Sequence, residues 1–164
     1  MSRKHNYKLS LKWHGNKGNG TADYKSYERS YTVQVGDKEI LEGSADPTFR
    51  GDKSKYNPED MLIAALSACH MLSYLHVCAT GGVVVVNYVD EATGLMETRS
   101  DGSGQFIEVI LNPVVTVADP SMLENANKFH KKASELCFIA NSVNFPVKHM
   151  PFAQVDTYIN HEES

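Results

Sequence analysis

Apolar and polar positions alternate in short segments over residues 1–45. Residues 7–13 alternate with a period of two, which is the pattern of a half-buried strand. Two further strand-like segments, 28–35 and 38–41, are separated by a glycine–aspartate turn at 36–37. Because the connections are short, we expect these segments to form a meander of three antiparallel strands.

A stretch that is apolar on nearly every side follows the polar segment 44–56. It predicts a long, centrally buried helix over residues 58–80. Asn57 is a suitable N-cap, and Pro58 suits the first helical position. Two glycines at 81–82 predict the end of this helix.

A second group of strands and a second helix follow. Residues 83–89 are rich in β-branched side chains, and the segments 95–99 and 105–117 extend the sheet predicted over 83–117. Apolar residues then recur every three or four positions, which predicts a helix over 120–138 with one buried face.

The last strand is expected within residues 150–160. The element order is then β-β-β-α-β-β-β-α-β, which predicts an α+β protein with antiparallel sheets. We see no internal repeat and no second domain, so residues 1–164 are expected to form one domain.

Composition excludes some classes of function. The chain has 16 basic and 20 acidic residues, and the basic ones are scattered, so we expect no nucleic-acid partner. Polar residues and two glycines interrupt the apolar run 61–86, so we expect no membrane span. Residues 1–6 lack the apolar run of a signal peptide, which favours a cytoplasmic protein.

The three cysteines are Cys69, Cys78 and Cys137, an odd number at irregular spacing. This is not a secreted disulfide framework; such cysteines are packing residues, metal ligands or redox groups. Cys69, on the first helix, is a core residue or a redox nucleophile that needs a cation and a second sulfur. Cys137 is a candidate second sulfur, whereas Cys78 lies about 13–14 Å along the helix from Cys69 and is interpreted as packing.

Arg50, in the polar loop, is a candidate cation, and Glu59 at the helix start is a plausible partner for its guanidinium. His70 follows Cys69 directly but points about 100° away around the helix.

A metal site is a competing hypothesis, with His76 beside the cysteines as a further soft ligand. The helical rise from Cys69 to His76 is about 10 Å, which is long for one ion. We therefore predict no metal ligands.

The sequence Asn-Pro-Glu-Asp at 57–60, followed by an apolar run that ends in Ala68-Cys69, resembles the signature of the OsmC/Ohr family of thiol-dependent hydroperoxide reductases. The segment 133–137 resembles the helix that carries the family's second cysteine. Residues 12–21 resemble its first hairpin. His70 and Met71, directly after the first cysteine, indicate a divergent branch.

The resemblance implies two antiparallel sheets wrapped around two central helices in an intertwined homodimer, with active sites at the subunit interface. It implies that Cys69 attacks the peroxide and that Cys137 then forms a disulfide with it. Glu59 matches the family's helix-start glutamate, and Arg50 its loop arginine. The resemblance further implies that the substrate is an organic hydroperoxide, that an external dithiol is the reductant, and that no cofactor is needed. The alternative is a non-enzymatic binding or interaction protein on the same scaffold.

Overall fold

The computed structural model describes residues 2–156. Contacts divide this chain into two compact units, with the boundary in the sequence between Leu62 and Ile63. We refer to them as the N-terminal unit and the C-terminal unit. Each has its own sheet structure, and the first turn of the long helix belongs to the N-terminal unit.

The N-terminal unit contains a three-stranded sheet in the order β1-β2-β3. Its strands are β1 (Ser10–Trp13), β2 (Tyr31–Gln34) and β3 (Leu41–Gly43), and both pairings are antiparallel. The predicted meander is therefore confirmed, although its strands are shorter than expected.

The third strand begins at Leu41 rather than at residue 38 because the preceding residues belong to the turn. Lys38 N–H donates to the carbonyl of Val35 at 3.2 Å, and the Gln34 side chain donates to the carbonyls of Gly36 and Lys38. Gly36 has a φ of 54°, the left-handed conformation that glycine adopts without strain.

Helix α1 runs over Pro58–Thr80, as predicted. The Asn57 side chain accepts from Asp60 N–H at 2.7 Å, and the Asp60 carboxylate accepts from Asn57 N–H, so the two cap each other. At the other end Gly82 adopts a φ of 75°, and Val83 N–H donates to the carbonyl of Cys78.

By length and composition alone, α1 could cross a membrane: its mean hydropathy is 1.6 over the most apolar window. Core helices of soluble proteins have the same two properties. The expectation that this segment does not span a membrane therefore stays a prediction.

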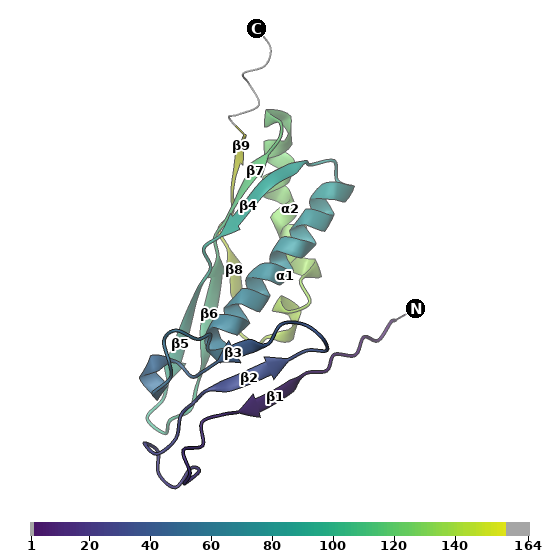
Figure 1. The fold of residues 1–164 in the computed structure, drawn as a ribbon. Coiled ribbons are helices and arrows are strands. Elements are labelled where there is room, and N and C mark those ends of the chain that lie inside the picture. Colours follow the sequence, from purple (N-terminus) through teal and green to yellow (C-terminus); the bar gives the residue numbers. More distant parts are fainter. Residues whose placement is uncertain (1, 157–164) are drawn as a thin grey trace. The chain divides into compact units, whose positions relative to one another are not determined.

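The C-terminal unit contains two three-stranded sheets, in the orders β4-β7-β9 and β5-β6-β8. Figure 1 shows β6 running on into β7, and β8 into β9, so the two sheets share their long direction. The strands are β4 (Val85–Asp90), β5 (Thr93–Thr98), β6 (Gly104–Leu111), β7 (Pro113–Val117), β8 (Val147–His149) and β9 (Phe152–Val155).

The predicted strand 105–117 is divided at Asn112. Its N–H donates to the Asp90 carboxylate at 2.7 Å, and its side chain donates to the carbonyl of Glu91. These two bonds do not belong to the hydrogen-bond pattern of either sheet. The segment is therefore divided into β6, in one sheet, and β7, in the other.

The pairings β6–β8 and β7–β9 are parallel, which differs from the expectation of antiparallel sheets. The reason is the crossover: β8 and β9 reach the sheets only after a helix, and such a connection returns the chain in the same direction. The strand β8 was not predicted, and of the strand expected within 150–160 the structure has β9. Residues 157–160 lie outside the described residues.

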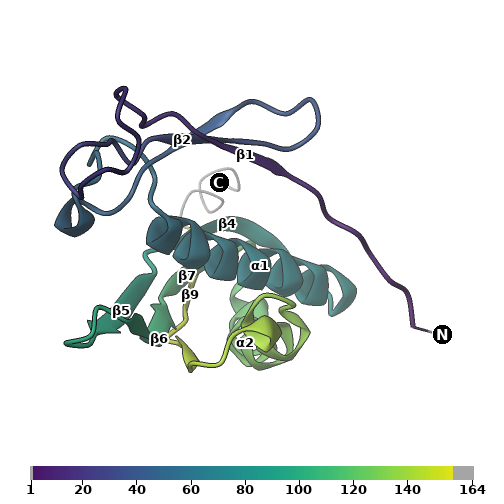
Figure 2. The same cartoon turned by 90° about the horizontal axis from the view of Figure 1, so that it is seen from below.

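The second helix, predicted over 120–138, begins as a 3₁₀ turn at Pro120–Met122 and continues as α2 (Leu123–Leu136). The Asp119 side chain accepts from Ser121 N–H and so fixes the start. Helix α2 packs against β7 and β9. Figures 1 and 2 both show it beside the later turns of α1. The buried core of this unit is made of Tyr74, Cys78, Val83, Val115, Val117, Ala126 and Ala133.

Candidate active site

Two of the three cysteines are brought together in the C-terminal unit. Cys69 is half-buried on α1, and Cys137 is buried, 1% exposed, at the C-cap of α2. Their side chains are hydrogen-bond partners. Cys78 is buried in the core and interacts with Tyr74 instead.

Cys137 is held at the point where the chain leaves α2. Its backbone is extended, with φ −73° and ψ 105°, and its sulfur accepts from Ala140 N–H at 3.4 Å. The Asn141 N–H donates to the Cys137 carbonyl at 3.1 Å. The chain thus folds back over the cysteine after the helix ends, and these hydrogen bonds hold the sulfur in place.

Burial, together with the hydrogen bond to Cys69, raises the pKa of the Cys137 thiol to about 11. At neutral pH Cys137 therefore keeps its proton. A protonated thiol that bonds to a neighbouring sulfur donates its S–H, and this stabilises negative charge on the acceptor. The pair is consequently unequal, and Cys69, the more exposed of the two, is placed to be the acceptor.

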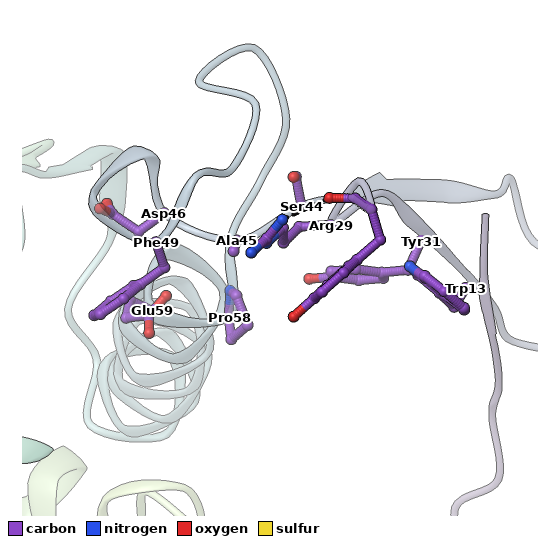
Figure 3. Close-up of a pocket in the computed structure, with 10 residues that line it drawn as sticks. Trp13, Arg29, Tyr31, Ser44, Ala45, Asp46, Phe49, Pro58 and Glu59 are labelled. Carbon is purple, nitrogen blue, oxygen red and sulfur yellow. Dashed lines mark hydrogen bonds between the residues drawn. The ribbon is translucent and has the colours of Figure 1, made fainter. Parts of the chain in front are cut away.

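A second feature is a pocket of about 380 Å³ within the N-terminal unit. Figure 3 shows Trp13 and Tyr31 on one side of it, and Phe49, Pro58 and Glu59 on the other. The remaining lining residues are Tyr27, Arg29, Ser44, Ala45 and Asp46.

Arg29 is fixed in this pocket by its own loop. Its guanidinium donates to the carbonyls of Tyr27 at 2.5 Å and Tyr24 at 2.7 Å. The same group lies 4.1 Å and 4.4 Å from the centroids of the Tyr27 and Tyr24 rings. An arginine held by two carbonyls and two rings is pre-organised, because little side-chain freedom remains to be lost on binding.

Glu59, half-buried in the first turn of α1, brings a negative charge to the same pocket. Burial, and then the charge of Glu59, raise the pKa of Tyr31 above its ordinary value. The Tyr31 hydroxyl has no hydrogen-bond partner among the described residues. The pocket therefore combines aromatic walls with an arginine, a carboxylate and an unused hydroxyl.

Arg50 lies elsewhere in the N-terminal unit. It is exposed, it follows the 3₁₀ turn Pro47–Phe49, and it has a φ of 65°, which is unusual for a non-glycine residue. Its N–H donates to the carbonyl of Pro47 at 3.0 Å. Arg50 is not among the residues that line the pocket, whereas Glu59 is.

The sequence of residues 51–150, well over half of the chain, matches the family model described as OsmC-like protein. The chain belongs to the OsmC-like protein family. The family resemblance inferred from the Asn-Pro-Glu-Asp segment and the two cysteines is thereby confirmed. No curated protein matches this OsmC-like chain.

Solved structures similar to this OsmC-like protein span nearly the whole chain. An OsmC-like protein of unknown function from Vibrio cholerae has a TM-score of 0.80 and 29% identity, covering 91% of this chain and all of that one. An organic hydroperoxide resistance protein from Elizabethkingia anophelis has a TM-score of 0.68 and 16% identity, covering 95% and 100%. An organic hydroperoxide resistance protein from Legionella pneumophila has a TM-score of 0.66 and 19% identity, covering 93% and 100%.

The α+β fold predicted from the family resemblance is confirmed by these similarities. The roles of Cys69, Cys137, Glu59 and Arg50 in this OsmC-like protein stay predictions. Sequence reasoning missed Arg29. The aromatic residues Tyr24 and Tyr27 just before it were the available signal, because arginine and tyrosine rings associate readily.

Proposed function

We propose that this OsmC-like protein is a thiol-dependent peroxidase that reduces organic hydroperoxides to alcohols. The observation that supports this most directly is the hydrogen-bonded Cys69–Cys137 pair, in which burial keeps Cys137 protonated. Two neighbouring structures are named organic hydroperoxide resistance proteins, and they share the fold.

The proposed reaction begins with attack of the Cys69 thiolate on the outer oxygen of the hydroperoxide. The O–O bond breaks, the alcohol leaves with a proton from solvent, and Cys69 becomes a sulfenic acid. The Cys137 sulfur then attacks Cys69, water leaves, and a disulfide forms. An external dithiol reduces this disulfide and restores both thiols.

The unequal environments of the two sulfurs suit this order of events. The peroxide must reach the first sulfur, and Cys69 is half-buried while Cys137 is 1% exposed. The second sulfur needs only to reach the first, and the hydrogen bond already brings them together. A resolving thiol in contact with the nucleophile also protects the sulfenic acid from further oxidation.

We propose that the pocket with Arg29 and Glu59 contributes to the same activity. Ligand sites combine apolar walls with a few polar groups that fix orientation, and this pocket has both. Its aromatic lining favours organic substituents over small polar ones.

We further propose that the protein acts as a cytoplasmic homodimer with a dithiol reductant. Apolar residues of the C-terminal unit support a partner surface: Leu72 on α1 is 63% exposed, and Val86 and Val89 on β4 are 46% and 50% exposed. Subunit interfaces, those of homodimers above all, bury apolar side chains of this kind.

Thiol titration tests the proposal. Adding one equivalent of cumene hydroperoxide to reduced protein is expected to remove two thiols per chain, with Cys69 and Cys137 linked in the peptide map. Dithiothreitol should restore both thiols. If no thiol is lost while the protein remains folded, the peroxidase assignment is wrong, and the non-enzymatic binding protein is the better interpretation.

Two arginine variants identify the cation that the activity needs. We expect Arg29→Met to lower kcat/KM for cumene hydroperoxide by about tenfold to a hundredfold, because the pocket would lose a charge that its own loop holds fixed. Arg50→Met, which removes an exposed guanidinium of the same size, serves as the matched variant. A larger loss with Arg50→Met would instead confirm the assignment implied by the family resemblance.

A further inference from the structure

A cluster of three histidines in the C-terminal unit plays no part in the proposed reaction. It joins His70 of α1, His130 of α2 and His149 of β8. His70 Nε2 lies 3.0 Å from His130 Nδ1, and the His70 and His149 ring centroids are 4.2 Å apart. His70 is fully buried and His130 is 3% exposed. This hydrogen bond joins the helices that carry the two reactive cysteines.

The His70–His130 pair has more N–H donors than its single hydrogen bond can accommodate. Two neutral imidazoles carry one N–H each, and only one of these can occupy the hydrogen bond between them. The outer nitrogens, His70 Nδ1 and His130 Nε2, are buried and have no hydrogen-bond partner among the described residues. With either tautomer, one N–H therefore points at no acceptor, and a further proton would add a charge there without a partner.

Besides His149 of β8, the groups around the pair come from α1 and β4. On α1, Tyr74 stacks on the His130 ring with centroids 3.9 Å apart and donates to the carbonyl of Ala126, while Cys78 contacts Tyr74. On β4, Tyr88 packs against Tyr74.

The acidic group that acts on the cluster is Asp90 of β4. Its effect is on His149, and its carboxylate already accepts from the Ser67 hydroxyl at 2.5 Å and from Asn112 N–H. Among residues 2–156, the pair is thus packed against aromatic rings, with the Cys78 thiol beyond Tyr74, and no counter-charge contacts it.

We propose that His70 and His130 are positioning residues that hold α1 to α2 beside the Cys69–Cys137 pair, and that acid weakens this link. The link between the helices does not depend on the proposed function. Its consequence does, because in a peroxidase a weaker link would limit disulfide formation at low pH. His70 is adjacent to Cys69 in the sequence, and His130 lies two helical turns before Cys137.

The direction of the acid effect follows from burial. Burial, with the neighbouring histidine charges, lowers the pKa of His70 to about 3, and that of His130 to about 4. Burial also lowers the pKa of His149, with Asp90 opposing it. The unfolded chain, with histidines near pKa 6.5, therefore binds more protons, and stability falls as pH drops from about 6.5 towards 4. Each such histidine raises the unfolding equilibrium constant by up to about tenfold per pH unit.

Three single variants of the full chain test this. His130→Asn places an amide where Nδ1 lies, so it can keep the hydrogen bond to His70 but cannot titrate. His130→Ala removes the bond. His76→Gln is the matched control, since His76 lies exposed on the same helix as His70.

The first measurement is denaturant unfolding between pH 6.5 and 5. In the wild type the logarithm of the unfolding constant rises as the pH falls. His130→Asn is expected to make this rise shallower by about one logarithmic unit per pH unit, and His76→Gln is expected to leave it unchanged. The second is disulfide formation at pH 7 with diamide, which takes two electrons and two protons from the two thiols. His130→Ala should slow it by about tenfold, and His130→Asn should restore it.

The proposal is overturned if His130→Asn keeps the wild-type slope, or if His130→Ala closes the disulfide at the wild-type rate. Neither measurement uses a peroxide. Both can therefore be interpreted even if the protein proves not to be a peroxidase. Should a variant not fold, imidazole ¹⁵N spectra of the wild type decide: neutral His70 and His130 at pH 5.5 support the proposal, and a protonated one overturns it.

Discussion

Replacing Cys69 with serine is expected to lower the rate of cumene hydroperoxide reduction by about a thousandfold or more, with no thiol lost. A serine hydroxyl stays protonated at neutral pH and is a poor nucleophile, whereas the thiolate is the species that attacks the peroxide. Losses of this size follow removal of the nucleophile in enzymes that use one. The measurement is peroxide consumption in the presence of dithiothreitol, together with thiol titration.

Cys78→Ala is the matched control for this variant, because Cys78 belongs to the same helix. Cys78 is 1% exposed, and burial raises the pKa of its thiol, which favours the unreactive protonated form. We expect this variant to retain the wild-type rate, with a modest loss of stability from the smaller core side chain. A fast reaction in Cys69→Ser, or a loss confined to Cys78→Ala, would contradict the assignment of the nucleophile.

The parts of the fold with strong local signals could be predicted from the sequence. Helix α1 begins and ends where Asn57, Pro58 and the two glycines indicate, because capping depends on residues within a few positions. For Cys69 and Cys137, the sequence provided only a candidate pair, which the family resemblance favoured, because the distance between two helices is not encoded in either of them.

The features that depend on distant segments could not be predicted in the same way. The parallel pairs β6–β8 and β7–β9 arise from where the chain returns after α2, and strand patterns alone do not carry pairing direction. His130 and His149 each look like an ordinary histidine in the sequence. Their contact with His70 joins residues 60 positions apart or more.

Replacing Cys137 with serine should separate the first chemical step from the second. Cys69 and its exposure are unchanged, so the first equivalent of peroxide is expected to react at a rate within about tenfold of the wild type. The sulfenic acid then has no partner thiol, so it should persist and be trapped by dimedone. Excess peroxide should convert it to the sulfinic acid, seen by mass spectrometry as two added oxygen atoms on the Cys69 peptide.

The wild type is the control for this outcome, because Cys137 should divert its sulfenic acid into a disulfide that dithiothreitol reverses. The hydrogen bond between the two side chains also makes a second effect measurable. Serine keeps a hydroxyl donor at this position, whereas Cys137→Ala removes the donor, so any further slowing of the first step in Cys137→Ala measures how much that donor stabilises the thiolate. If Cys137→Ser still loses two thiols per chain, the second sulfur must be Cys78, and the packing interpretation of Cys78 fails.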